Sequence, residues 1–239
     1  MARLEHDLLA KYRRIDYWRS YSSDDAKIDT IDSLEKANNS FQKALIKIAS
    51  TYPASLRYNF KSLQDSGLLI ATSDDHRFRI YSWDSEEGGT MHIFFTVYQW
   101  LGEQGVNAKA SNSEEGGDPG VFCTPIYTLR TPSKTYFLVV NHAIFSNKDS
   151  YQGIQAFCIN KRSLNDSVRL FKTLTGLKNS ISFEYDFFSV VNRPERPIQL
   201  ISFDSVHKII SIPIVLENGT VTNRSIQYHW VGNYFERRK

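Results

Sequence analysis

Apolar side chains occur at helical spacing in the first fifty residues. Between residues 24 and 51 they recur every three or four positions, which places them on one face of an α-helix; they are Ile28, Ile31, Leu34, Phe41, Leu45 and Ile48. Ser22, Ser23 or Asp24 is expected to cap this helix, and Pro53 to end it. A second helix is predicted over about residues 3–20, so that the two form a helical hairpin.

After about residue 66 the pattern changes to short runs rich in Ile, Val, Phe and Tyr, separated by Gly, Asn, Asp, Ser and Pro. Such runs predict strands joined by tight turns. The Asn218-Gly219 pair favours a type I′ hairpin turn, which needs positive φ angles. Three groups of four strands are expected: 68–72, 78–83, 91–100 and 121–129; 136–141, 154–160, 168–174 and 181–188; 198–203, 207–216, 220–231 and 234–236.

These elements predict a mainly β fold with N-terminal α-helices, divided into a helical segment, 1–52, and an antiparallel β domain, 53–239. Three successive meanders favour a propeller-like arrangement, and a β-sandwich or an open barrel is the alternative. Propellers typically close with about four to eight blades. Three units would therefore make an incomplete or unusual propeller.

Composition changes this picture little. Aromatic residues make up 13% of the chain, and Phe and Tyr favour pleated sheets. The 29 basic and 26 acidic side chains give a net charge of only +3, so no nucleic-acid partner is predicted. No run approaches the roughly 18 apolar residues that a membrane-spanning helix needs. We expect a soluble protein without a membrane span, and the sequence does not indicate its oligomeric state.

The sequence does not determine the cellular compartment of the protein either. Residues 1–20 carry charges throughout, unlike an intact signal peptide. A periplasmic or secreted protein without its leader would have the same sequence. Cys123 and Cys158 lie in strand-like runs, where a buried free thiol is the usual state; a disulfide would require neighbouring strands and an oxidising compartment.

One segment carries a family resemblance. Residues 68–84, LLIATSDDHRFRIYSWD, resemble the central hairpin of tryptophan-aspartate propeller repeats, because a small-residue strand and an acidic turn lead into a strand that ends in Trp83-Asp84. The segment occurs once and lacks the Gly-His pair of such repeats. The resemblance implies a propeller-like hairpin here.

A longer stretch, FRIYSWD followed by GGTMH at 88–92, is similar to a motif of uncharacterised bacterial proteins, often exported, that end in a Gly-x-Tyr-Phe meander. The matching ending here is Gly232-Asn233-Tyr234-Phe235. The resemblance spans about two-thirds of the chain. It implies a bacterial origin and brings no activity with it.

The nearest approach to a metal site is formed by Asp74, Asp75, His76 and His92. Carboxylates and imidazoles bind divalent metals, but this spacing matches neither a zinc helix nor a calcium loop. Asp-Asp-His also suits a hairpin turn, because short polar side chains bond back to the turn backbone. The turn is the favoured interpretation.

Candidate catalytic residues lack a supporting motif. A Ser-Glu-Glu-Gly-Gly sequence occurs twice and contains four carboxylates, Glu86, Glu87, Glu114 and Glu115. The second copy lies inside an expected mobile loop over about 102–120. Glycine-rich loops position acid–base groups poorly. No flanking motif ties either cysteine to a histidine base. No phosphate-binding loop or dinucleotide fingerprint is present, and no cofactor is predicted.

Two functional hypotheses follow. The first is a non-enzymatic protein-binding module, for example an envelope-associated partner or an immunity-type inhibitor of another protein. Its expected binding surface comprises Trp83, Glu86, Glu87, Trp100, Glu114 and Glu115, because strand aromatics and polar loops suit recognition. The alternative is a metal-dependent or carboxylate hydrolase that uses the region from Asp74 to His92.

Overall fold

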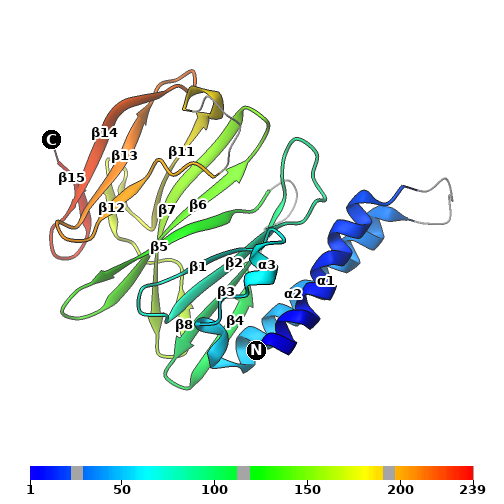
Figure 1. Cartoon of the computed structure of the whole chain (residues 1–239). Coiled ribbons are helices and arrows are strands. Elements are labelled where there is room, and N and C mark those ends of the chain that lie inside the picture. Colours follow the sequence, from blue (N-terminus) through cyan, green and yellow to red (C-terminus); the bar gives the residue numbers. More distant parts are fainter. Residues whose placement is uncertain (23–28, 112–118, 191–196, 239) are drawn as a thin grey trace.

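The computed structural model describes residues 1–22, 29–111, 119–190 and 197–238. The chain begins with two helices, α1 (Ala2–Ser20) and α2 (Thr30–Thr51), which run side by side as the predicted hairpin (Figure 1). A 3₁₀ turn, η1 (Pro53–Leu56), and a short helix, α3 (Lys61–Gln64), lead into the strands. None of the described helices is long and apolar enough to cross a membrane.

Helix α2 begins later than predicted. Asp29 caps it, and its carboxylate accepts a hydrogen bond of 3.0 Å from the amide of Asp32. Ser22 lies outside the helix, and Ser23, Asp24 and Ile28 fall outside the described residues. Ile31, placed on the apolar face by its spacing, is 78% exposed, because it lies in the first turn. The remaining apolar positions of that face are buried: Leu34, Phe41, Leu45 and Ile48.

The described strands form three sheets with almost entirely antiparallel pairing. The first sheet has the order β1-β2-β3-β4, with β1 (Leu69–Thr72), β2 (Phe78–Asp84), β3 (Phe94–Gly102) and β4 (Gly105–Ala110). The second has the order β11-β7-β6-β5, with β5 (Phe122–Arg130), β6 (Thr135–Ile144), β7 (Asp149–Asn160) and β11 (Ser180–Asp186); the short β8 (Ser163–Asn165) pairs with β7.

The third sheet has the order β10-β9-β15-β14-β13-β12. Its strands are β9 (Phe171–Thr173), β10 (Gly176–Lys178), β12 (Ser202–Asp204), β13 (Ile209–Val215), β14 (Val221–Trp230) and β15 (Phe235–Arg237). The hairpin of β13 and β14 turns at Asn218-Gly219 as predicted, but it is not a type I′ turn, because Gly219 has a positive φ (+85°) and Asn218 does not. A short 3₁₀ turn, η2 (Phe187–Ser189), follows β11.

Two features of the predicted strand grouping are wrong. Strand β4 lies within residues 102–120, where a loop was expected, and pairs with β3; the alternation of small and polar side chains from Gly105 to Ala110 hides it from a hydrophobicity pattern. Two strands were also assigned to the wrong group: residues 121–129 were placed in the first, yet β5 pairs with β6 in the second sheet, and residues 168–174 were placed in the second, yet β9 pairs with β10 and β15 in the third sheet.

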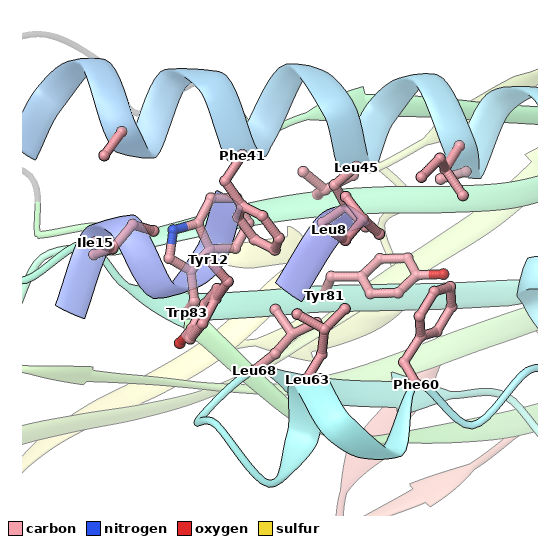
Figure 2. Close-up of a cluster of buried hydrophobic side chains, with 14 of the residues drawn as sticks. Leu8, Tyr12, Ile15, Phe41, Leu45, Phe60, Leu63, Leu68, Tyr81 and Trp83 are labelled. Atoms are coloured by element: carbon pink, nitrogen blue, oxygen red, sulfur yellow. The ribbon is translucent and has the colours of Figure 1, made fainter. Parts of the chain in front are cut away.

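The helical hairpin and the three sheets are stacked in layers (Figure 1), and a cluster of buried hydrophobic side chains lies between each two neighbouring layers. Side chains of α1, α2 and α3 pack on one face of the first sheet, as Figure 2 shows for Phe41, Tyr81 and Trp83. A second cluster, including Phe78 and Phe137, lies between the first and second sheets. A third lies between the second and third sheets. The helical segment therefore shares a core with the β domain.

Strand β2 is buried on both faces, and its polar residues Arg79 and Ser82 are buried together with its apolar ones. Side chains alternate across a strand: Tyr81 and Trp83 pack against the helices, whereas Phe78 and Ile80 pack against the second sheet. The mainly β fold with N-terminal helices and antiparallel sheets is thus confirmed. The stack does not close into a barrel and agrees with the open sandwich alternative; closure into a propeller is not confirmed.

Candidate functional site

A cavity of about 500 Å³ opens at one end of the interface between the first and second sheets. Its walls are mostly apolar, and one acidic and one imidazole side chain lie among them. This composition is typical of sites that bind an apolar group and orient it through a few polar contacts. The lining residues are Leu69, Asp84, His92, Phe94, Phe122, Ile144, Asn147, Phe187, Phe188 and Pro197.

Backbone hydrogen bonds hold the cavity walls together. The amide of His92 donates to the carbonyl of Ile144 (3.1 Å), and that of Phe94 donates to Pro119 (2.7 Å). Gly120 permits the second contact, because it has φ +66° and a Cβ there would lie 2.3 Å from the carbonyl oxygen of Phe94. The loop that carries His92 is therefore tied to the second sheet.

Aromatic rings form most of the apolar wall. The rings of Phe94 and Phe122 lie 4.6 Å apart, on strands of different sheets. Turn η2 contributes Phe187, which is buried, and Phe188, which is 58% exposed at the rim. Asp186 caps this turn by accepting a hydrogen bond of 2.9 Å from the amide of Phe188. The rim thus presents one large apolar side chain to solvent, next to a hollow.

Asp84 and His92 form a hydrogen-bonded pair in the wall of this cavity. Oδ2 of Asp84 contacts Nδ1 of His92, and Oδ1 accepts a bond of 2.9 Å from the amide of Glu86. A carboxylate at Nδ1 favours the tautomer with its proton there, which leaves Nε2 as an acceptor. No described residue forms a hydrogen bond with Nε2. The pair can therefore accept a proton or a hydrogen bond from a bound molecule.

Glu86 adds a second carboxylate near this pair. Partial burial, and next the charge of Asp84, raise the pKa of Glu86. Arg19, from the last turn of α1, forms an ion pair of 3.0 Å with it. Glu86 has a positive φ of 61°, which turns the chain sharply after β2. The end of the helical hairpin is thereby linked to the loop that carries His92.

Glu87 faces the helices instead. Its carboxylate accepts a hydrogen bond of 3.0 Å from Asn38 of α2, and burial followed by the charge of Glu35 raises its pKa. Glu87 lines a different hollow, between α2 and the start of β3. The two adjacent carboxylates predicted as one binding surface therefore point to different neighbours.

Two aromatic residues predicted for the binding surface are buried. Trp83 is completely inaccessible, and its indole Nε1 donates to Oδ1 of Asn38 (3.0 Å). Trp100 is also buried, and its Nε1 donates to the carbonyl of Arg162 (2.7 Å). Neither ring reaches the surface, because β2 and β3 lie in a sheet covered on both faces. Glu114 and Glu115 fall outside the described residues.

The predicted metal ligands are divided between two ends of the first sheet. Asp75 accepts hydrogen bonds from Ser73 Oγ (2.7 Å) and the amide of Arg77 (3.0 Å), as expected for a hairpin turn. His76 has φ +54° in the same turn, and Asp74 is exposed there. His92 lies beyond the far end of β2, roughly 20 Å away at strand spacing. Within the described ranges, no group of three His, Cys, Asp or Glu side chains could hold a metal.

The two cysteines are free and buried, as expected. Cys123 lies in the core between the first two sheets, and burial raises the pKa of its thiol to about 12. His142 stacks on Phe122 with ring centroids 4.8 Å apart, and burial lowers its pKa to about 4. Thr124 and Gln152 are its hydrogen-bond partners, so it is tied to neutral groups and not to a thiol.

Sequence patterns identified only part of this cavity. His92 was a candidate, and Asp84 stands in the Trp-Asp motif without having been selected. Phe122, Ile144 and Phe188 carry no signal of their own, because they come from separate strands and a turn that only the folded chain brings together. In comparisons with protein-family models, curated proteins and solved structures, no match to this chain was found, so the resemblance to bacterial proteins stays a prediction.

Proposed function

We propose that this chain is a non-enzymatic protein-binding module whose contact site is the cavity between the first two sheets. The observation that supports this most directly is the exposed Phe188 at the rim of an apolar hollow. Binding energy at protein interfaces concentrates where a large side chain of one partner fills a pocket of the other. A partner that places an apolar side chain beside His92 would bury Phe188 at the same time.

The polar groups of the site suit this role. The Asp84 and His92 pair can accept a hydrogen bond from a partner group, and the ion pair of Glu86 with Arg19 places charged groups near it, outside the cavity lining. Charged groups around apolar centres contribute to orientation and association rate more than to affinity. An immunity-type inhibitor, which covers a site on another protein, would be one form of such a module.

Site-specific photocrosslinking tests the proposal. A photoreactive phenylalanine replaces Phe188 in the full chain, and the matched control carries it at Leu174, which is 99% exposed in the turn between β9 and β10. We expect a discrete protein adduct from position 188 and none of the same mass from position 174. With the isolated partner, Phe188→Ala and Leu69→Trp should each weaken binding at least tenfold, whereas Leu174→Ala should change it less than twofold. Equal affinity of all variants would refute the site.

A second candidate function, a hydrolase, is favoured by one specific observation. Asp84 orients His92 within an apolar cavity, an arrangement that can activate water as a general base. The control is built into the chain, because Asp204 and His207 form a similar pair, 2.7 Å apart, on an exposed turn. Turnover of short-chain aryl esters that is lost in His92→Gln and kept in His207→Gln would support the hydrolase. No turnover above the buffer rate, or equal loss in both variants, would eliminate it.

A further inference from the structure

Four turns meet at the end of the molecule opposite the Phe188 cavity, and three of them carry basic side chains. These turns connect β1 with β2, β3 with β4, β5 with β6, and β7 with β8. Two adjoining hollows lie among them, of about 1010 and 380 Å³, and both are lined by Ser133, Lys134 and Ile159. Because these residues line both hollows, the two lie side by side, and together we call them the depression.

Positive charge dominates this depression. Four cationic side chains line it, namely Arg77, Lys134, Lys161 and Arg162, against a single lining carboxylate, Glu103. Asp74 and Asp75 belong to the first turn but line neither hollow. Among the described residues, none of the four cations forms an ion pair, whereas Lys36 and Lys61 on the helices pair with Asp32 and Asp65. The local charge is therefore far more positive than the net charge of the chain suggests.

Hydroxyl and amide groups stand between the cations. The lining includes Thr131, Ser133, Thr135 and Ser163, together with Gln104 and Asn160. Hydroxyls and cations are the side-chain groups that bind phosphate oxygens through charge-assisted hydrogen bonds. The hydroxyls of Thr131 and Ser163 already donate to the backbone carbonyls of Lys134 and Asn160, so the neutral donors left for a ligand include the hydroxyl of Thr135 and the amide of Gln104.

Hydrogen bonds between the turns fix their relative positions. The amide of Leu101 donates to the carbonyl of Arg77 (2.8 Å), and that of Glu103 donates to Lys161 (2.9 Å). Trp100 holds the same β7–β8 turn through its bond to the carbonyl of Arg162. A site fixed in advance loses less conformational entropy when a ligand binds. The buried Trp100 therefore contributes to this surface indirectly, by positioning a cationic turn.

We propose that this depression binds a small soluble molecule that carries two or more phosphate groups. Two hollows joined at Lys134, each with its own cations, fit separate phosphate groups better than a single one. The depression is bordered by four turns, which suits a compact ligand better than a nucleic-acid strand. This site is independent of the protein-binding role proposed for the Phe188 cavity.

Calorimetric titration of the full chain with pyrophosphate, at low and at physiological ionic strength, tests the proposal. We expect saturable binding of one pyrophosphate per chain, and inorganic phosphate to bind at least tenfold more weakly. The double variant Lys134→Gln, Lys161→Gln should lose at least tenfold in affinity. The control variant Lys36→Gln, Lys61→Gln removes the same charge from the helices and should lose less than twofold. Unchanged melting temperatures would establish that both variants fold.

Three results would overturn the proposal. In the first, pyrophosphate gives no saturable heat. In the second, both double variants lose affinity equally, which would mean that net charge alone explains binding. In the third, a single-stranded thymidine oligonucleotide or vesicles containing phosphatidic acid would bind more tightly than pyrophosphate, with affinity that increases with strand length or phosphatidic acid content. That outcome would assign the surface to nucleic acid or to a membrane.

Discussion

Trp83 of strand β2 donates its indole N–H to the side-chain carbonyl of Asn38 in helix α2, over 3.0 Å and with both residues completely buried. Asn38 uses its amide nitrogen as well, toward the carbonyl of Ser85 (2.8 Å) and the carboxylate of Glu87 (3.0 Å). One helical side chain thus holds the end of β2 and the start of the loop that leads to His92. The contact lies next to Phe41, whose ring packs edge-on against Trp83 (Figure 2).

Replacement of Asn38 by alanine should destabilise the fold strongly. The variant leaves the indole N–H of Trp83 and the carbonyl of Ser85 buried without these partners. We expect a loss of about 3 kcal/mol in the free energy of unfolding, measured by urea denaturation. The neighbouring Asn39→Ala is the matched control and should change stability by less than about 0.5 kcal/mol. Similar losses in the two variants would contradict this role of Asn38.

Arg79 should not tolerate lysine. Its guanidinium is buried, donates to Thr72 Oγ1 (2.8 Å), and donates from Nη1 to the carbonyls of Ser55 and Tyr58 (2.6 Å each). A lysine ammonium cannot reproduce the planar fork that reaches these acceptors. We expect Arg79→Lys to lower the unfolding free energy by about 2 kcal/mol, and Arg57→Lys, on the exposed surface, to leave it unchanged. An Arg79→Lys variant as stable as the parent would show that these bonds contribute no net stability.

His142 should make stability depend on pH. Burial lowers its folded-state pKa to about 4, from 6.5 in the unfolded chain. Between these values the unfolded chain binds a proton that the folded chain does not, so stability decreases as pH falls from about 6.5 to about 4. The full loss corresponds to about 3 kcal/mol.

The comparison of His142→Gln with the parent chain measures the contribution of His142 to the pH dependence of stability, because the other titratable groups contribute equally in the two proteins. Their difference in unfolding free energy should vary with pH in that window and stay constant above pH 7. A pH-independent difference for His142→Gln would mean that the imidazole protonates readily in the folded protein.

The cysteines should be unreactive in the folded protein. Both thiols are buried, and burial raises the pKa of the Cys123 thiol to about 12, so little reactive thiolate forms. A thiol reagent should label neither residue in native buffer and both in denaturant, as read by intact mass. Rapid native labelling of Cys123 would reveal frequent opening between the first two sheets. Failure of both residues to react in denaturant would indicate a disulfide.

Adjacent phenylalanines in turn η2 should separate stability from binding. Phe187 is buried, so Phe187→Ala should cost about 4 kcal/mol of unfolding free energy. Phe188 is 58% exposed, and Phe188→Ala should change stability by less than about 0.5 kcal/mol while weakening partner binding. Thermal and urea unfolding of the two variants provide the comparison. A large loss of stability in Phe188→Ala would show that the ring is a core residue and not a contact for a partner.

The sequence by itself determined the local elements of this protein. Apolar spacing identified α1 and the buried face of α2, and alternating or continuous apolar runs located most of the strands, because both signals depend on neighbours close in the chain. It also indicated correctly that Asp75 belongs to a turn and that the cysteines are buried and free. Strand β4 was not predicted, because its alternating side chains are small or polar, and only its pairing with β3 makes it a strand.

Only the tertiary structure decided which residues meet. Tryptophan is a residue type that suits protein contacts, yet Trp83 and Trp100 are buried by the layers on both faces of the first sheet. A sequence pattern does not reveal that these layers cover both faces. The cavity with Asp84, His92 and Phe188, and the basic depression around Lys134, each combine side chains from distant strands and turns. Their formation depends on how sheets stack and which turns share an end, and these arrangements are set by packing between residues far apart in the chain.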